Sequence, residues 1–299
     1  MERFFQYIFD GLSVGAIYAL LALGLVVVFR GTGHLNFAQG EMAMFCTFLV
    51  WQVHDWGLPL WLAVIVGMIL GFVLGAATEV VLIRPVAKRS VGAVFVISIA
   101  LFLGLNSLAS MIWGALPNEA MPNLFPAAPD DFVRISGAVW RYKSIGVLVV
   151  ALVLCGLLFL LFRKTKFGLA MRAVANNADS ARLVGIRTGN VLMASWGIAA
   201  AMGALSGALV AGNNGEVNSS LMFTVFIYAS AAATLGGLDS PGGAVVAGLS
   251  IGVLENMAAG YAPAWIGQEM RLGVALLTIF VVLLLRPSGL FGSTRVERV

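Results

Sequence analysis

The sequence predicts an all-α integral membrane protein, a polytopic bundle of about eight or nine transmembrane helices with broken or re-entrant segments. Of its 299 residues, 60% are apolar and only 11% are charged, and the mean hydropathy is +0.97. A soluble domain carries about a quarter charged residues, so this chain has too few polar side chains to cover a water-exposed surface. Apolar stretches of about 20 residues, the length that crosses a hydrocarbon core of about 30 Å, recur along the chain.

The connections between the expected spans differ in charge. Basic residues concentrate in three of them, at 84–89, 163–187 and 286–298, and the positive-inside rule places such segments in the cytoplasm. The proline-rich connection 114–143 is separated from two of them by an odd number of spans, so we expect an external loop there. In chain order, the expected spans are 5–29, 38–53, 58–83, 91–113, 144–162, 189–212, 223–238, 242–259 and 269–286.

The side of the membrane on which the N-terminus lies stays open at this point. Nine full spans place it outside, whereas a re-entrant segment near residues 34–53 returns it to the cytoplasm. The net charge of +4 does not indicate a nucleic-acid partner, because the basic residues lie in short loops at membrane boundaries rather than on one polar face. We expect one transmembrane domain over residues 1–299, embedded in a lipid bilayer.

Glycine spacing predicts close helix packing inside this domain. Gly67, Gly71 and Gly75 recur at four-residue intervals, as do Gly203 and Gly207. Small residues at that spacing let helix backbones approach closely in lipid. A further glycine-rich stretch interrupts two apolar runs at 231–248, where we expect a tight turn between helices.

The segment 30–44, RGTGHLNFAQGEMAM, places Asn36, Gln39 and Glu41 between two apolar runs. An ionised glutamate at mid-bilayer costs about 2.5 to 3.5 kcal/mol, so Glu41 must be paired, protonated, next to a cavity or near the interface. A broken helix that lines a polar cavity would accommodate these residues. The alternative is an interfacial loop with Glu41 in the first turn of the next helix, where its charge suits the helix dipole.

Two further acidic residues, Glu79 and Glu255, lie in long apolar stretches. Glu79 precedes Arg84 by five residues near an expected cytoplasmic boundary. We therefore interpret it as half of an interfacial ion pair rather than as a transport site. Glu255, which is followed by Asn256, is a candidate to face the interior of the bundle.

Residues 167–187, FGLAMRAVANNADSARLVGIR, form a polar and basic interruption long enough for a short helix. Around a period of 3.6 residues, Arg172, Asn176 and Asp179 share one face and apolar residues share the opposite one. Gly185 is placed to end the helix in the left-handed conformation that glycine tolerates. Such a helix suits a membrane protein that receives motion from a soluble subunit; the alternative is a helix that rests on lipid headgroups.

Several kinds of chemistry are missing from the sequence. It contains no G-x-x-x-x-G-K-[ST] phosphate loop, no cluster with metal-ligand spacing and no paired catalytic groups. We therefore expect no bound metal or cofactor and no catalytic residue in this chain; if ATP powers it, the nucleotide binds another subunit. Cys46 and Cys155 lie inside apolar stretches without disulfide spacing, so we expect packing residues there.

Six short sequence motifs occur along the chain in an order that is typical of one protein family. They are GLSVGAIYALLALGLVVVF at 11–29, LNFAQGEMAM at 35–44, RP at 84–85, FGLAMRAVANNADSARLVGI at 167–186, LGGLDSPGGAVVAG at 235–248 and RPSGLFG at 286–292. In sequence and order they resemble the LivH-type permeases of bacterial ABC importers for branched-chain amino acids. The resemblance covers nearly the whole chain and is weakest at 114–143.

The resemblance implies an ATP-driven importer in the bacterial cytoplasmic (inner) membrane, in which this chain is a multi-pass permease subunit and not an enzyme. The implied partners are a second, homologous permease chain, two cytoplasmic ABC ATPases that bind ATP and magnesium, and a periplasmic or lipid-anchored substrate-binding protein. Residues 167–186 are then the counterpart of the coupling helix, which docks into a groove of an ATPase. The positions that match the family there are Arg172, Ala173, Asp179, Ala181 and Gly185.

We expect transport by alternating access, with leucine, isoleucine and valine as the default substrates. An amino acid needs donors for its carboxylate and acceptors for its ammonium group, and Asn36, Gln39 and Glu41 are the expected polar lining of the path. Related permeases serve urea and short amides, so a substrate of that kind is one alternative. The other is an ion-coupled secondary carrier, in which Glu41 or Glu255 binds a proton or a cation and no ATPase is needed.

Overall fold

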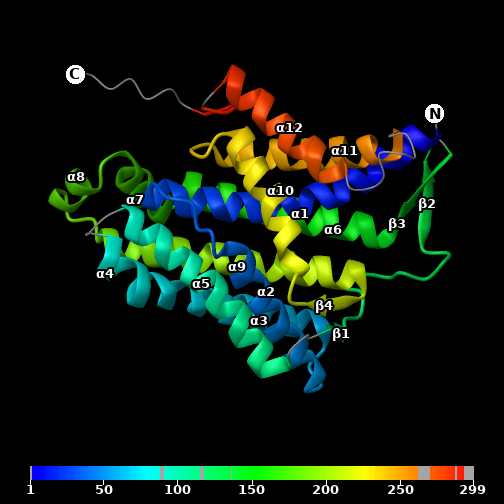
Figure 1. The fold of residues 1–299 in the computed structure, drawn as a ribbon, viewed down its shortest axis with the longest axis horizontal. Helices are drawn as coiled ribbons and strands as arrows, with labels where there is room; N and C mark the ends of the chain where they lie inside the picture. Colours follow the sequence, from blue (N-terminus) through cyan, green and yellow to red (C-terminus); the bar gives the residue numbers. More distant parts are fainter. Residues whose placement is uncertain are drawn as a thin grey trace. The chain divides into compact units, whose positions relative to one another are not determined.

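The computed structural model describes residues 2–87, 91–114, 118–135, 137–261, 270–286 and 288–292, and these residues are mainly helical. Of the basic residues in the expected cytoplasmic segments, Lys88, Arg89, Arg295 and Arg298 lie outside the described part. The elements in chain order are α1 (Glu2–Thr32), α2 (Gln39–Asp55), α3 (Leu60–Thr78), the π-helical η1 (Glu79–Ile83), α4 (Arg84–Ala87), α5 (Val91–Trp113), β1 (Asn118–Ala120), β2 (Phe132–Ile135), β3 (Ala138–Arg141), α6 (Tyr142–Lys164), α7 (Lys166–Asn176), α8 (Ala178–Leu183), α9 (Thr188–Asn214), β4 (Glu216–Asn218), α10 (Leu221–Gly236), α11 (Pro241–Tyr261) and α12 (Met270–Leu285) (Figure 1).

Each expected span corresponds to a helix. In the part of the chain that the structure describes, six helices are long and apolar enough to cross a membrane: Glu2–Thr32, Leu60–Ala87, Gly92–Trp113, Tyr142–Lys164, Thr188–Asn214 and Pro241–Tyr261. Helix α10 and residues 276–285 of α12 form shorter apolar helices, and α2 has 17 residues. The prediction of a polytopic all-α membrane protein is confirmed.

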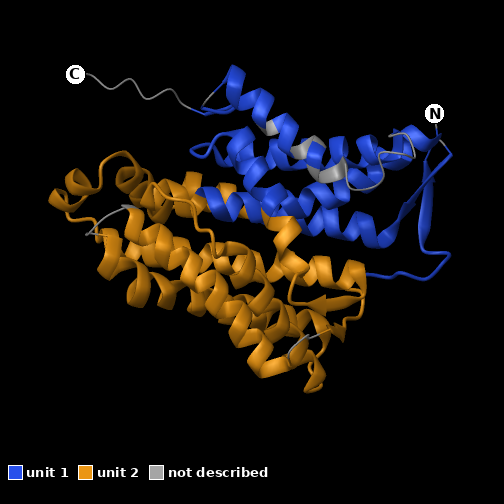
Figure 2. Cartoon of the chain, viewed as in Figure 1, with its two compact units in different colours: residues 1–26, 125–155, 227–299 blue, residues 27–124, 156–226 orange. Residues whose placement is uncertain are grey.

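The chain divides into two compact units (Figure 2). Unit 1 comprises residues 1–26, 125–155 and 227–299, and unit 2 comprises residues 27–124 and 156–226. Unit 2 contains α2, α3, α5 and the helices from α7 to α9, and therefore most of the polar residues singled out from the sequence. The expectation of one transmembrane domain stays a prediction.

Helices α2, α3 and α9 pack side by side in the core of unit 2 (Figure 1). A Cβ atom on Gly71 would lie 3.0 Å from the carbonyl oxygen of Ala200, and one on Gly75 would overlap the carbonyl oxygen of Trp196. Gly71 and Gly75 therefore lie directly against the backbone of α9, whereas Gly67 faces Val50 of α2, and the predicted close packing is confirmed. Large side chains at 65, 69 and 73 are exposed on another face of α3, as expected for a face that meets lipid.

Unit 1 has its own close helix contact, between α1 and α11. A Cβ atom on Gly11 would lie 2.6 Å from Cα of Val253, and one on Gly15 would lie 2.8 Å from the carbonyl oxygen of Gly248. The sequence reading did not single out this pair of helices, although Gly11 and Gly15 have the same four-residue spacing as the glycines of α3.

The expected turn at 231–248 also lies in unit 1. Helix α10 ends at Gly236, and Gly237 adopts φ +99°, a left-handed conformation that favours glycine. The backbone N–H of Leu290 donates to the carbonyl of Leu235 over 2.8 Å. The motifs at 235–248 and 286–292 are thus joined, because the C-terminal motif satisfies a carbonyl that the end of α10 leaves open.

The connection 114–143 contains short strands that the sequence reading did not predict. Within unit 1, β2 and β3 form an antiparallel hairpin. Within unit 2, β1 pairs antiparallel with β4, so that Glu119 lies opposite Val217. The external position of this connection stays a prediction.

Candidate functional site

The break between α1 and α2 positions the first polar residues. Helix α1 ends at Thr32 and α2 begins at Gln39, so an irregular segment separates the two apolar runs within residues 30–44, as both interpretations of that segment require. The side-chain oxygen of Asn36 accepts a hydrogen bond from the backbone N–H of Ala38 at 3.0 Å. This local bond replaces helical hydrogen bonding at the break and orients the start of α2.

Asn36 and Gln39 form one connected pair. The amide of Asn36 donates to Oε1 of Gln39 at 3.1 Å, and Nε2 of Gln39 donates to the carbonyl of Ala199 in α9 at 2.8 Å. Both side chains are buried. Gly203 lies beside this pair, since a Cβ atom there would be 3.4 Å from Nε2 of Gln39. Two buried polar side chains are therefore held together where the start of α2 packs against α9.

Glu41 is also buried but has a different partner. Its Oε2 accepts a hydrogen bond from Nδ2 of Asn106 in α5 at 3.1 Å, and the same amide nitrogen lies 3.3 Å from the carbonyl oxygen of Ser219. Residues two apart on a helix project to widely separated directions, so Gln39 bonds to α9 and Glu41 to α5. The structure thus brings Asn36 and Gln39 together and directs Glu41 elsewhere.

Both interpretations of the 30–44 segment find a counterpart in the structure. The break between α1 and α2 is required by both interpretations, and the place of Glu41 in the first turn of α2 is the feature specific to the helix-start interpretation. A role for Asn36, Gln39 and Glu41 in the translocation path stays a prediction.

Asn106 is a residue that the sequence reading missed. It lies within the apolar helix α5, where an amide is an unusual residue. Polar side chains inside spanning helices are rare and tend to have a partner, and this signal was present in the sequence. Its partner was not, because Glu41 and Asn106 are 65 residues apart.

The polar segment 167–187 contains two helices rather than the single helix expected. Helix α7 is capped by Thr165, whose side chain accepts from the N–H of Gly168, and α8 is capped by Asn177, whose side chain accepts from the N–H of Ser180. Asn177 is extended, with φ −157° and ψ 107°. The helix is interrupted because an asparagine side chain can bond to the backbone ahead of it and start a new helix.

The two faces predicted for this segment survive the interruption. Arg172, Asn176 and Asp179 are exposed. On the face predicted to be apolar, Val174 and Ala181 are buried and Ala170 and Ala178 are half-buried. The burial therefore follows the predicted pattern although the segment is divided into two helices.

The other residues singled out in the segment 167–187 differ in exposure and in hydrogen bonding. Ala173 is half-buried, and Nη1 of Arg172 donates to the carbonyl of Phe162 at the end of α6 over 3.0 Å. Gly185 adopts φ +85° and its N–H donates to the carbonyl of Arg182, so the predicted glycine stop is confirmed. Just before it, the large apolar side chains of Leu183 and Val184 are 89% and 77% exposed.

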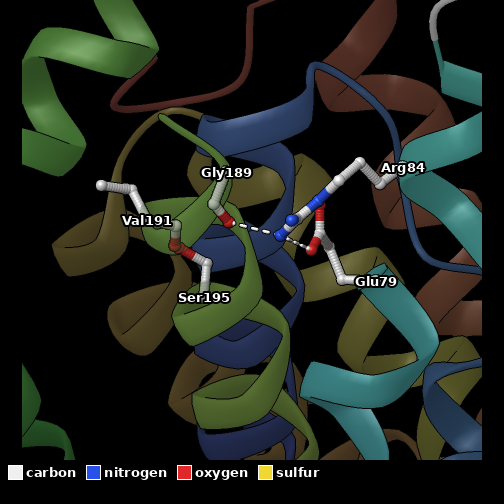
Figure 3. A network of polar contacts seen from close by, with 5 residues as sticks. All are labelled: Glu79, Arg84, Gly189, Val191 and Ser195. Carbon is white, nitrogen blue, oxygen red and sulfur yellow. Dashed lines mark hydrogen bonds and ion pairs between the residues drawn. The ribbon is translucent and has the colours of Figure 1, made fainter. Parts of the chain in front are cut away.

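Glu79 and Arg84 form the ion pair expected from the sequence (Figure 3). The Nε atom of Arg84 donates to Oε1 of Glu79 at 3.1 Å, and Nη2 donates to Oε2 at 2.5 Å. The same Nη2 atom donates to the carbonyl of Gly189 in the first turn of α9 at 2.8 Å. This third contact was not expected, because nothing in the local sequence places α9 beside α4.

Glu255 is buried within unit 1, as proposed from its position in an apolar stretch. The hydroxyl group of Tyr18 donates to its Oε2 at 2.8 Å, and the ring of Tyr18 stacks on that of Tyr228 with centroids 4.8 Å apart. Both cysteines are buried packing residues. No group of three or more side chains suited to a metal ion occurs among the residues described.

Comparison with known proteins places this geometry in a family. The chain matches the branched-chain amino acid transport system permease component family over residues 7–283. It is 30% identical to the high-affinity branched-chain amino acid transport permeases LivH of Escherichia coli K12 and BraD of Pseudomonas aeruginosa, each over 99% of this chain and 98% of the relative. It is 24% identical to the galactose/methyl galactoside import permease MglC of Escherichia coli K12, over 86% of this chain and 71% of that protein.

No solved structure matches the chain. The match to the family nevertheless extends from α1 into α12. The similarity to LivH and BraD covers almost the full length of this chain and of each relative. The chain therefore belongs to the family of permease components of branched-chain amino acid transport systems.

Proposed function

We propose that this chain imports branched-chain amino acids across the bacterial inner membrane as one permease of a heteromeric ABC importer. Its proposed partners are a second, homologous permease, two cytoplasmic ATPases that bind ATP and magnesium, and a periplasmic or lipid-anchored binding protein. The observation that carries the substrate class is the full-length similarity to LivH and BraD, both of which are branched-chain amino acid permeases.

The segment 165–187 supports a role in docking to an ATPase. It consists of two short capped helices that are tied to α6 and α9 by Arg172 and Arg182. It also exposes Leu183 and Val184, and large apolar side chains at a polar surface favour a protein contact. We propose that these two residues enter the ATPase groove, with Arg172 and Asp179 at the margin of the contact.

The polar residues of unit 2 support a path for a zwitterion. An amino acid that leaves water needs hydrogen-bond donors for its carboxylate and acceptors for its ammonium group. Asn36 and Gln39 provide amide donors, while Glu41 and the carbonyl of Ala199 provide acceptors. In the structure Asn36 donates to Gln39 and Gln39 donates to the carbonyl of Ala199, whereas Glu41 accepts separately from Asn106. We propose that substrate passage exchanges these bonds for bonds to the amino acid during alternating access.

The decisive experiment is uptake by the complete importer in proteoliposomes. We expect labelled leucine, isoleucine or valine to accumulate only when ATP and the binding protein are both present, and urea and galactose to serve as comparison substrates. Accumulation of urea in place of the amino acids would assign the chain to an amide importer. Accumulation driven by an ion gradient without ATP would instead support a secondary carrier that uses Glu41 or Glu255.

A further inference from the structure

Glu79 lies immediately after the end of α3, where the helix geometry changes. Residues 79–83 form the π-helical segment η1, which joins α3 to α4. Such segments are rare and frequently occur at functional sites. The Glu79 side chain is only 2% exposed. A buried carboxylate needs a cation and hydrogen-bond donors, and both of its oxygens accept from Arg84.

Arg84 does more than neutralise this carboxylate. Its guanidinium group bridges the end of α3 to α9, because Nη2 also donates to the carbonyl of Gly189. A Cβ atom on Gly189 would lie 3.3 Å from Cζ of Arg84, so the guanidinium group lies directly against the backbone of α9. We call Glu79, Arg84 and Gly189 the Arg84 latch (Figure 3).

The latch is joined to the segment proposed to dock to the ATPase. Thr188, which precedes Gly189, accepts a hydrogen bond from Nε of Arg182 at 3.0 Å. Arg182 in turn pairs with Asp179 on α8 at 3.2 Å. A continuous series of polar contacts and one peptide bond therefore connects α8 with the end of α3, and every member of it belongs to unit 2.

Helices α3 and α9, which this series of contacts reaches, can pass a displacement on to α2. Gly71 and Gly75 let α3 lie against the backbone of α9, and close-packed backbones leave little room for one helix to move without the other. Helix α9 also holds the Ala199 carbonyl that accepts from Gln39. A shift of α8 that moves Thr188 also moves α9, and α9 contacts Gln39 of α2 through the Ala199 carbonyl.

We propose that the Arg84 latch and the Arg182–Thr188 contact together transmit the movement of α8 to α3 and α9, so that Glu79, Arg84 and Thr188 are positioning residues for transport. The inference rests on the proposed function, because it needs a motor subunit that moves α8. A latch made of one bidentate ion pair and one bond to a helix carbonyl holds the two helices in a defined register.

The test compares three variants in the complete importer: Glu79→Gln, Thr188→Val and the double variant. Uptake and ATP hydrolysis are both measured per assembled complex, so that a loss of assembly does not count as a loss of coupling. We expect ATP hydrolysis to continue while uptake per ATP falls about tenfold in Glu79→Gln and somewhat less in Thr188→Val. The double variant should lose no more than Glu79→Gln alone, because both changes interrupt one series of contacts.

Ser98→Ala is the matched control for the lost hydroxyl group. Ser98 is buried in α5 and bonds to the Val94 carbonyl of its own helix, so its removal should leave uptake per ATP unchanged. If the variants assemble less well but each assembled complex keeps a normal uptake per ATP, the latch proposal is overturned. The Glu79–Arg84 ion pair would then serve only to stabilise the fold. Additive losses in the double variant would also overturn it.

Thr188→Val decides the question alone if Glu79→Gln does not assemble. Measurements on the wild-type importer distinguish a failure of the latch from a failure of the proposed function. ATP-dependent uptake by the wild type with normal coupling in Thr188→Val rejects the latch alone, whereas failure of the wild type to import an amino acid with ATP rejects the proposed function.

Discussion

At the scale of single residues, the buried polar side chains Asn36, Gln39 and Glu41 all have hydrogen-bond partners. The reason is physical, since a polar group removed from water without a partner costs several kcal/mol. The partners differ in how they arise: Asn36 and Gln39 are near neighbours in the chain, whereas Glu41 depends on an amide from another helix.

Replacing Asn106 by alanine tests this dependence. Glu41 would lose the amide that donates to it, and an unsatisfied buried acceptor costs about 1 to 3 kcal/mol. We expect a lower midpoint of thermal unfolding for the purified permease in detergent. Asn123→Ala removes an exposed amide and should leave the midpoint unchanged; equal midpoints for the two variants would mean that Asn106 does not stabilise the buried acid.

The sequence predicted part of these pairings. Glu79 and Arg84 were paired correctly because they are close in sequence at an expected membrane boundary. Residues five apart do not face each other on an α-helix, so it is the π-helical η1 that brings the two side chains together. Asn106 and Gly189 were missed because their contacts depend on how one helix is placed along another. Side-chain packing sets that register, and the local sequence does not encode it.

At the scale of elements, helix packing depends on glycines that face a neighbouring backbone. The glycine stripe of α3 was predicted from its spacing, and the structure assigns Gly71 and Gly75 to α9 and Gly67 to α2. The π-helical η1 and the break at Asn177 were not predicted. Their hydrogen-bond patterns depend on single side chains and on neighbouring helices, so hydrophobic periodicity does not reveal them.

Gly75→Ala and Gly104→Ala form a matched pair of substitutions. A methyl group at 75 would overlap the carbonyl of Trp196, whereas nothing lies within 4 Å of the corresponding position at 104. We expect Gly75→Ala to lower the free energy of unfolding by about 1 to 3 kcal/mol, because α3 and α9 must separate. Gly104→Ala should be neutral or stabilising, since alanine favours helix by about 1 kcal/mol. Denaturation in mixed micelles measures both, and equal loss in the two variants would contradict the close contact.

At the scale of the whole molecule, the exposed apolar end of α8 is the surface on which assembly is proposed to depend. Leu183→Asp should weaken the complex with the ATPases, because burying a leucine side chain contributes about 1.5 to 3 kcal/mol. Co-purification of the ATPases with the tagged permease measures the effect. Ser180→Asp places the same charge on an exposed position of α8 and is expected to keep the ATPases; their loss in both variants would indicate a response to charge alone.

The sequence by itself determined that this is a polytopic helical membrane protein, where its expected spans lie, and which family it belongs to. These properties are local, because about 20 apolar residues suffice to specify a spanning helix and because short motifs recur in a fixed order. The tertiary structure decided which residues meet. It joined Gln39 to α9, Glu41 to Asn106, and Arg84 to Gly189, since such contacts depend on the register between helices that are distant in the chain.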